Sequence, residues 1–187
     1  MNSSHPHPRA DEVHPDKVDT LTPLPLLAEP LTAASFAPFG EVIESEGHGP
    51  LLINDGMTER FHDLAQVDVQ AGDGRPLINL FHALPYVLPL RIRELERHPL
   101  GSQAFVPLDR QPFLVVVAPA GEAPTAASVR AFLTSGLQGV NYRRGVWHHS
   151  LIVLGEPSRF VVVDRGGPGD NCDLFTLAAP LELQIRA

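Results

Sequence analysis

The sequence is dominated by short apolar runs that are rich in β-branched residues and bounded by glycine, proline, asparagine or aspartate. Four such runs cover residues 77–81, 113–117, 151–154 and 160–163. Each run is too short for a typical helix, and β-branched and aromatic side chains favour extended backbone. The sequence therefore predicts a mainly β protein. Many short strands with few helices indicate a barrel or a sandwich rather than a parallel α/β sheet.

Two stretches depart from this pattern and predict helices. Thr32 is a suitable N-cap for a short helix that would turn Phe36 inward. A longer helix is predicted from Thr125 to Gly136, because Thr125 can cap its start and Gly136 can end it. The apolar face of this second helix would consist of Val129, Phe132 and Leu133.

The chain is predicted to consist of a tail and one domain. Residues 1–24 are rich in proline, histidine and charge and show no periodicity, which predicts a flexible N-terminal extension. Residues 25–187 should form a single domain, because a chain of 187 residues with 43% hydrophobic positions has enough apolar material for one core.

Charge and composition exclude several classes of function. The formal net charge is −8, which argues against general nucleic-acid binding and against docking to anionic membranes. We find no apolar run near the roughly 20 residues that cross a bilayer, and no signal peptide. Cys172 is the only cysteine, so no intramolecular disulfide can form. We therefore expect a cytoplasmic protein.

Lysine usage restricts the chemistry. Lys17 is the only lysine, and it lies in the predicted extension, so the domain has no lysine for a Schiff base. Recognition of a carboxylate therefore falls to arginine, whose planar fork can bind a carboxylate through two nitrogens.

The first candidate site lies in residues 88–98. If this segment is extended, an apolar stripe runs into Glu94, Glu96 and His98 on the same face. Two carboxylates and an imidazole would then meet near the mouth of a barrel. Leu95 falls on the opposite face, which indicates a bulge or a twist. Periodicity alone slightly favours the alternative, a surface strand end with ordinary exposed charges.

The second candidate site contains the adjacent His148 and His149. Neighbouring residues of a strand face opposite ways, so only one of these two histidines can point inward. The Gly145-x-x-His148 turn before an apolar strand is similar to the second metal-binding motif of cupins, which favours His148. A histidine satisfied by backbone groups explains the pattern at least as well.

The third cluster, residues 164–173, is rich in glycine. It has no Gly-Lys-Ser/Thr ending and no helix signal follows it, so we do not expect nucleotide binding. Cys172 is conceivable as a nucleophile, but a structural thiol is favoured. The Gly-x-Ser-x-Gly elbow of serine hydrolases is absent from the sequence.

Together, these clusters are similar to the ureidoglycolate lyase family, also called ureidoglycolate hydrolase. The most specific match is ELERHPLGSQAF at residues 94–105. The other matches, in the family's order and spacing, are NDG at 54–56, ERFHDL at 59–64, RAF at 130–132, QGVNY at 138–142, WHH at 147–149, DRGG at 164–167 and DNCD at 170–173. The similarity runs from about Leu26 to Asp173. Ser150 departs from it, since the family usually has a proline there, and this leaves the strand geometry after His149 in question.

The resemblance implies a cupin-like antiparallel β-barrel with a few short helices, a homodimer, and a role in allantoin and purine breakdown. Aligning the cupin pattern places Glu96, His98, Gln103 and His148 at the metal-ligand positions. Gln103 stands where cupins usually have glutamate, and a neutral amide binds a transition metal more weakly than a carboxylate does. The family is often described as nickel-dependent, so the resemblance implies Ni²⁺ as the candidate divalent ion.

The implied reaction is the cleavage of (S)-ureidoglycolate to glyoxylate and urea. The substrate is a carbinolamine, so a base must take its hydroxyl proton and an acid must protonate the departing urea nitrogen. We predict that Glu94, Glu96 or His148 is the base. His98 is predicted to be the acid or a metal ligand.

Substrate binding is predicted for a further group of side chains. Arg97 and Arg165 are the candidates for the substrate carboxylate, with Arg60 behind them, although strand alternation turns Arg97 away from Glu96. The other predicted substrate contacts are Gln103, Asn141 and Tyr142.

Two alternative functions remain: an amidohydrolase that releases ammonia from the same substrate, and a non-catalytic cupin that binds a small acid.

Overall fold

The computed structural model describes residues 21–186, and strands make up about half of this range. The predicted N-terminal extension lies outside the described residues, apart from positions 21–24. The strands are β1 (Leu24–Pro30), β2 (Gly40–Ile43), β3 (Leu51–Ile53), β4 (Thr58–Arg60), β5 (Arg75–Ala83), β6 (Pro85–Tyr86), β7 (Leu90–Arg97), β8 (Gln103–Pro107), β9 (Phe113–Ala118), β10 (Arg130–Leu133), β11 (Gly139–Tyr142), β12 (Trp147–His148), β13 (Ile152–Leu154), β14 (Ser158–Gly166) and β15 (Asp173–Ile185).

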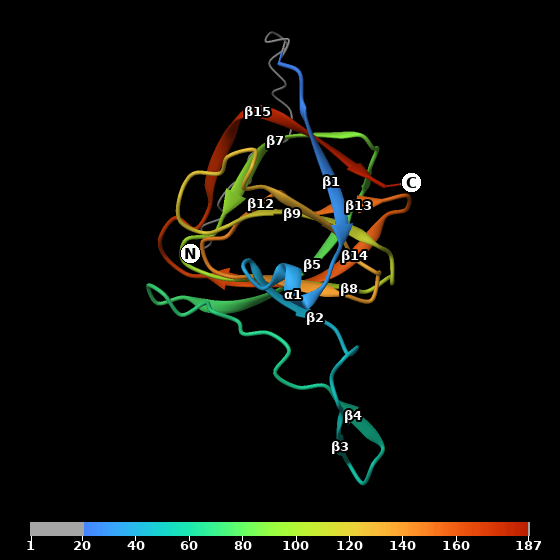
Figure 1. The fold of residues 1–187 in the computed structure, drawn as a ribbon. Coiled ribbons are helices and arrows are strands. Elements are labelled where there is room, and N and C mark those ends of the chain that lie inside the picture. The colour runs from blue at the N-terminus through green and yellow to red at the C-terminus, as the bar shows by residue number, and fades with distance from the viewer. Residues whose placement is uncertain (1–20, 187) are drawn as a thin grey trace.

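The larger sheet closes on itself. Its strand order is β10-β1-β15-β7-β12-β9-β13-β6, and β10 also pairs with β9. That additional pairing joins β9, β10, β1, β15, β7 and β12 into a barrel (Figure 1). Most neighbours are antiparallel, but β1 runs parallel to both β10 and β15. The predicted fold class, a mainly β, cupin-like barrel, is confirmed.

A second sheet, with the order β2-β11-β8-β14-β5, packs against β9 and β10. Strand β9 separates two apolar cores, because alternate side chains of the strand point to opposite faces. Phe113, Val115 and Val117 belong to the core shared with the second sheet. Leu114 and Val116 belong to the core inside the barrel. Both faces of β9 are therefore buried, and this fixes the two sheets against each other.

The first predicted helix is confirmed as α1 (Ala33–Phe36). The Thr32 side chain accepts a hydrogen bond from the Ser35 backbone N–H, and the Ser35 side chain accepts one from the Thr32 backbone N–H. This reciprocal pair is a capping box, which satisfies amide groups that the helix itself leaves unpaired. Phe36 is fully buried, so the short helix closes one end of the core shared by the two sheets.

The second predicted helix, from Thr125 to Gly136, is wrong. Only a turn follows Thr125, closed by a hydrogen bond from Ser128 N to Thr125 O of 3.0 Å, and β10 occupies Arg130–Leu133. Ala131 points into the barrel core while Phe132 points into the other core. A strand that is buried on both faces has no polar face, so its spacing of apolar residues imitates that of a helix.

The Phe132→Ala variant tests this placement of β10. The Phe132 ring meets Phe36 edge to face with centroids 5.9 Å apart and lies 6.0 Å from Phe39. We expect the free energy of unfolding to fall by about 3–5 kcal/mol in urea titrations, because a large cavity would open between the sheets. Leu137→Ala, on an exposed side chain of the next loop, should change it by less than about 0.5 kcal/mol. Equal stability of the two variants would contradict the assignment.

A hairpin of β3 and β4 projects from the barrel (Figure 1). We call residues 45–60, which contain it, the arm. Every residue of the arm is exposed. In the described part of the chain, β3 and β4 pair only with each other. Residues 21–186 as a whole contain no helix that is long and apolar enough to cross a membrane.

Candidate active site

Three side chains that are distant in sequence meet where β7 lies beside β12. Glu96, near the end of β7, is directly opposite His148 of β12 in the strand register. His98 follows β7 by one residue. Metal-ligating atoms of Glu96, His98 and His148 all lie within 4.8 Å of one another. The structure thus brings together three of the predicted site residues in one cluster.

Position along β7 determines which carboxylate enters the cluster, because Glu96 and not Glu94 lies opposite His148, and β7 itself is irregular before Glu94. Ile92 and Leu95 are both buried in the barrel core although they are three positions apart, so strict alternation fails between them. The pairing of β7 with β15 shifts in register between Thr176 and Leu181, which confirms the bulge expected near Leu95. Glu94 is exposed and accepts a hydrogen bond of 3.2 Å from the Thr176 hydroxyl, outside the cluster.

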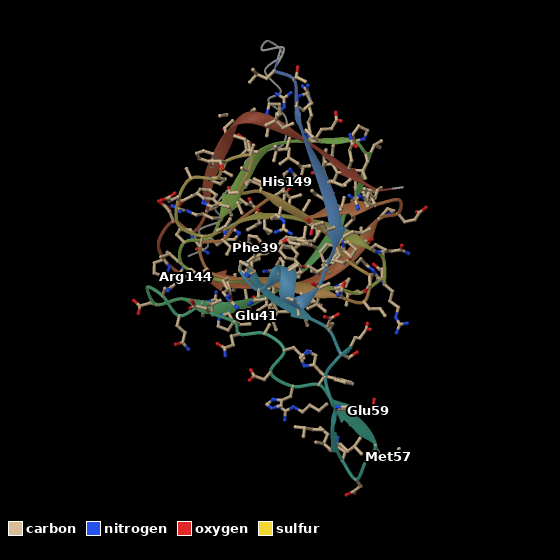
Figure 2. The ribbon with its side chains drawn as sticks, in the orientation of Figure 1. Phe39, Glu41, Met57, Glu59, Arg144 and His149 are labelled. Carbon is tan, nitrogen blue, oxygen red and sulfur yellow. The ribbon has the colours of Figure 1, made fainter. Side chains whose placement is uncertain are left out.

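The two adjacent histidines point in different directions, as strand alternation requires. The side chain of His148 is only 1% exposed and stacks on the Tyr142 ring, with centroids 4.4 Å apart and an angle of 16°. His149 instead meets the ring of Tyr86. Figure 2 labels His149 on the barrel. The inward histidine is His148, the one that the cupin pattern favours.

Backbone carbonyls set the tautomers of both clustered imidazoles. His98 Nδ1 lies 2.6 Å from Asn171 O, and His148 Nδ1 lies 3.1 Å from His149 O. A carbonyl oxygen only accepts hydrogen bonds, so each Nδ1 carries the proton and each Nε2 keeps a free lone pair. Both Nε2 atoms are buried and have no hydrogen-bond partner in the described chain.

The two free imidazole lone pairs, together with two oxygen ligands from Gln103 and Glu96, fit a divalent metal ion. Gln103 Oε1 is a third buried acceptor without a partner among the described residues, and the Glu96 carboxylate lies beside the imidazoles. Burial, and next the proximity of His98, lower the pKa of His148 to about 3, so this imidazole is neutral near pH 7. Neutral imidazole and oxygen ligands suit nickel or zinc. Glu96, His98, Gln103 and His148 could therefore hold such an ion.

A polar cavity of about 310 Å³ opens onto this cluster. Its lining residues are His98, Gln103, Asp164, Arg165, Asn171 and Cys172. Sequence reasoning assigned no role to Asp164, which accepts a hydrogen bond of 3.0 Å from Asn79 and has its pKa raised by burial. Alternation along β14 is the signal that could have found it, because Val162 and Phe160, two and four residues earlier, are fully buried.

Tyr142 and Cys172 keep their protons in this environment. Burial, and then the charge of Glu96, raise the pKa of the Tyr142 phenol, so its hydroxyl can donate a hydrogen bond. Burial and Glu96 likewise raise the pKa of the Cys172 thiol, whose Sγ lies 3.9 Å from Glu96 Oε2. A raised pKa disfavours the thiolate, in keeping with the preference for Cys172 as a structural thiol over a nucleophile.

A family model described as Ureidoglycolate lyase matches residues 23–184. This chain belongs to the ureidoglycolate lyase family. It is 62% identical over 158 residues to a protein named ureidoglycolate lyase from Burkholderia mallei (strain NCTC 10229), which covers 84% of this chain and 92% of the relative. The protein of that name from Azotobacter vinelandii is 56% identical over 148 residues, with 79% and 89% covered. The one from Stutzerimonas stutzeri is 55% identical over 160 residues, with 86% and 94% covered.

The arginines predicted to bind a substrate carboxylate in this ureidoglycolate lyase family member are held by the chain itself. Arg97 Nε donates to Asp173 at 2.8 Å, and its guanidinium carbon lies 4.5 Å from the centroid of the Trp147 ring. The Arg97 guanidinium is therefore bound to other groups outside the cavity. Arg165 lines the cavity, but its Nε and Nη2 bind the carbonyl oxygens of Ala71, Gly72 and Pro168.

The remaining predicted contacts lie in different places. The Asn141 amide nitrogen donates to Glu41 Oε2 at 2.7 Å and to Gln66 O at 3.0 Å, while its Oδ1 is buried and has no partner among residues 21–186. Tyr142 reaches the cluster through its stacking on His148. Arg60 is the last residue of β4. It therefore lies on the arm and is not among the residues that line the cavity.

Proposed function

We propose that this protein cleaves (S)-ureidoglycolate to glyoxylate and urea, as a carbon–nitrogen lyase of allantoin breakdown. The observation that carries the proposal is the cluster of Glu96, His98 and His148, with a carboxylate and two imidazoles within 4.8 Å of one another, in a member of this family. The cavity beside the cluster, at about 310 Å³, suits a ligand of only a few heavy atoms.

The reaction needs two proton transfers at one carbon. Ureidoglycolate carries a hydroxyl, a carboxylate and the urea nitrogen on that carbon. Removal of the hydroxyl proton forms the carbonyl of glyoxylate as the carbon–nitrogen bond breaks, and the departing nitrogen takes a proton to give urea. No water is consumed. The protein must therefore supply a base and an acid on the two sides of the reacting carbon.

The geometry favours Glu96 over Glu94 as the base. Glu96 Oε1 lies 3.7 Å from His148 Nδ1, whereas Glu94 is exposed and bound to Thr176. A carboxylate beside the neutral imidazole of His148 can accept the hydroxyl proton directly. Tyr142, which keeps its proton, is placed to donate a hydrogen bond to a substrate oxygen.

His98 Nε2 can act as the acid or as a metal ligand but not as both, because its single lone pair binds either a proton or an ion. Protonated, it would give its proton to the urea nitrogen. Unprotonated, it would join His148 Nε2 and Gln103 Oε1 in holding a divalent ion, for which we propose Ni²⁺. A bound ion would polarise the substrate hydroxyl and lower its pKa.

Product analysis separates the proposed lyase from its two alternatives. We expect purified protein supplied with ureidoglycolate to release glyoxylate and urea in equal amounts, and no ammonia. Ammonia released with the glyoxylate would instead show an amidohydrolase. Binding without turnover would show a small-acid-binding protein. Racemic substrate that is consumed to about half would support the preference for one stereoisomer.

The location and assembly of the enzyme form a further part of the proposal. Membership of the family supports a homodimer that acts in the cytoplasm on a small-molecule substrate.

A further inference from the structure

The arm carries apolar side chains that nothing in the described chain covers. Leu51, Leu52 and Met57 are 52%, 65% and 86% exposed, and Figure 2 shows Met57 and Glu59 well away from the barrel. A single two-stranded hairpin is at best marginally stable in water. An apolar hairpin that projects from a barrel therefore indicates a surface that binds another molecule.

The cavity lacks a complete binding group for a carboxylate. Its lining includes the acidic Asp164, and Glu96 lies next to two lining residues, His98 and Cys172. Among residues 21–186, Arg165 is the only arginine that lines it. Two of its three guanidinium nitrogens are bound to backbone carbonyls, which leaves at most Nη1 for a ligand. Firm capture of a carboxylate uses two parallel N–H···O bonds, so a second cationic group is required.

Arg60 is a free cation that is joined to the rim of this cavity. It ends β4 and makes no hydrogen bond or ion pair with the residues that the structure describes. A short segment joins it to Gln66, whose carbonyl oxygen accepts a hydrogen bond from Asn141 beside the cluster. Figure 1 shows that β4, which Arg60 ends, projects away from the barrel.

We propose that two copies of this chain exchange arms and that Arg60 of each copy completes the carboxylate-binding site of the other. A second copy matches the arm in both charge and apolarity. Its cavity presents Asp164 to the cation, with Glu96 beside the lining residues His98 and Cys172. The exposed Leu174, opposite Glu96 in the strand register, offers an apolar contact on the neighbouring surface. Exchange of an identical element about a two-fold axis satisfies both copies at once. The identity of the carboxylate rests on the proposed function.

A mixed dimer distinguishes exchange from folding back of the arm onto its own chain. Chains with Arg60→Ala and chains with His98→Ala are given different affinity tags, expressed together, and purified through both tags. Under arm exchange, the Arg60→Ala chain keeps His98 and receives the partner's Arg60. The mixed dimer then has one intact site of two and should show about half of the wild-type kcat, while each parent dimer stays at least about 100-fold lower. A mixed dimer no more active than its parents would overturn the proposal.

Two controls keep this result interpretable. The first control uses Arg110→Ala, which changes an exposed arginine between β8 and β9, in place of Arg60→Ala. Its mixed dimer with His98→Ala should have one intact site whether the arms exchange or fold back. Sedimentation of a Leu52→Asp, Met57→Asp double variant should show monomers where the wild type is a dimer, and a wild-type monomer would also overturn the proposal. This readout needs no substrate, so inactivity of the wild type on ureidoglycolate would refute the proposed function without deciding the arm exchange.

Discussion

The His98→Ala and Glu96→Gln variants are each expected to lower the kcat for ureidoglycolate cleavage by about 10²–10⁴-fold, the range typical of a lost acid or base. Glutamine keeps the size of Glu96 but cannot accept the hydroxyl proton. Alanine at position 98 removes Nε2, which would either give its proton to the urea nitrogen when protonated or hold the ion through its lone pair. Rates of glyoxylate release at saturating substrate provide the measurement.

Matched substitutions outside the cluster separate lost chemistry from lost folding. Glu156→Gln and His82→Ala change exposed residues of the same types and should keep kcat within about twofold of the wild type. Both site variants should unfold at nearly the wild-type urea concentration, because Glu96 and His98 are only partly buried. Near-normal glyoxylate release by both site variants would show that the cluster is not the catalytic centre.

Removal of a bound divalent ion is expected to have the second large effect on kcat. After exhaustive chelation, we expect kcat to fall by about 100-fold or more, and added Ni²⁺ to restore it at about one ion for each chain. The physical reason is the set of buried lone pairs on His98, His148 and Gln103, which have no other partner in the described chain and which an ion would satisfy.

The histidines of the tail require a specific control, since His5 and His7 could bind Ni²⁺ on their own. His148→Ala keeps the tail and loses one imidazole of the cluster, so its Ni²⁺ content should be lower than that of the wild type by about one ion for each chain. His82→Ala should match the wild type. Full activity of a chain shown by elemental analysis to be metal-free would contradict a metal-assisted reaction and would leave His98 as the acid.

The strands that carry the site could be predicted from sequence, because their patterns have a direct physical cause. The apolar runs of β5, β9, β13 and β14 were found as short β-branched segments. Alternation alone established that one of His148 and His149 points inward. The capping pattern at Thr32 correctly predicted α1, since a cap depends only on local residues.

The errors and gaps arise where partners distant in sequence decide the structure. Strand β10 was taken for a helix because burial of both Ala131 and Phe132 removes the polar face that identifies a strand. Strict alternation places Glu94 and Glu96 on one face, and only the pairing of β12 with β7 shows that Glu96 alone joins the histidines. Arg165 looked available for a ligand, and its bonds to Ala71 and Gly72 come from a loop whose position the sequence does not reveal.

The comparison of His148→Ala with His149→Ala in one glyoxylate-release assay tests the central claim most directly, namely that β12 delivers a single imidazole to a centre shared with Glu96 and His98. We predict that His148→Ala loses at least about 100-fold in kcat and that His149→Ala loses less than about tenfold. Full turnover by His148→Ala, or a larger loss in His149→Ala than in His148→Ala, would contradict the claim.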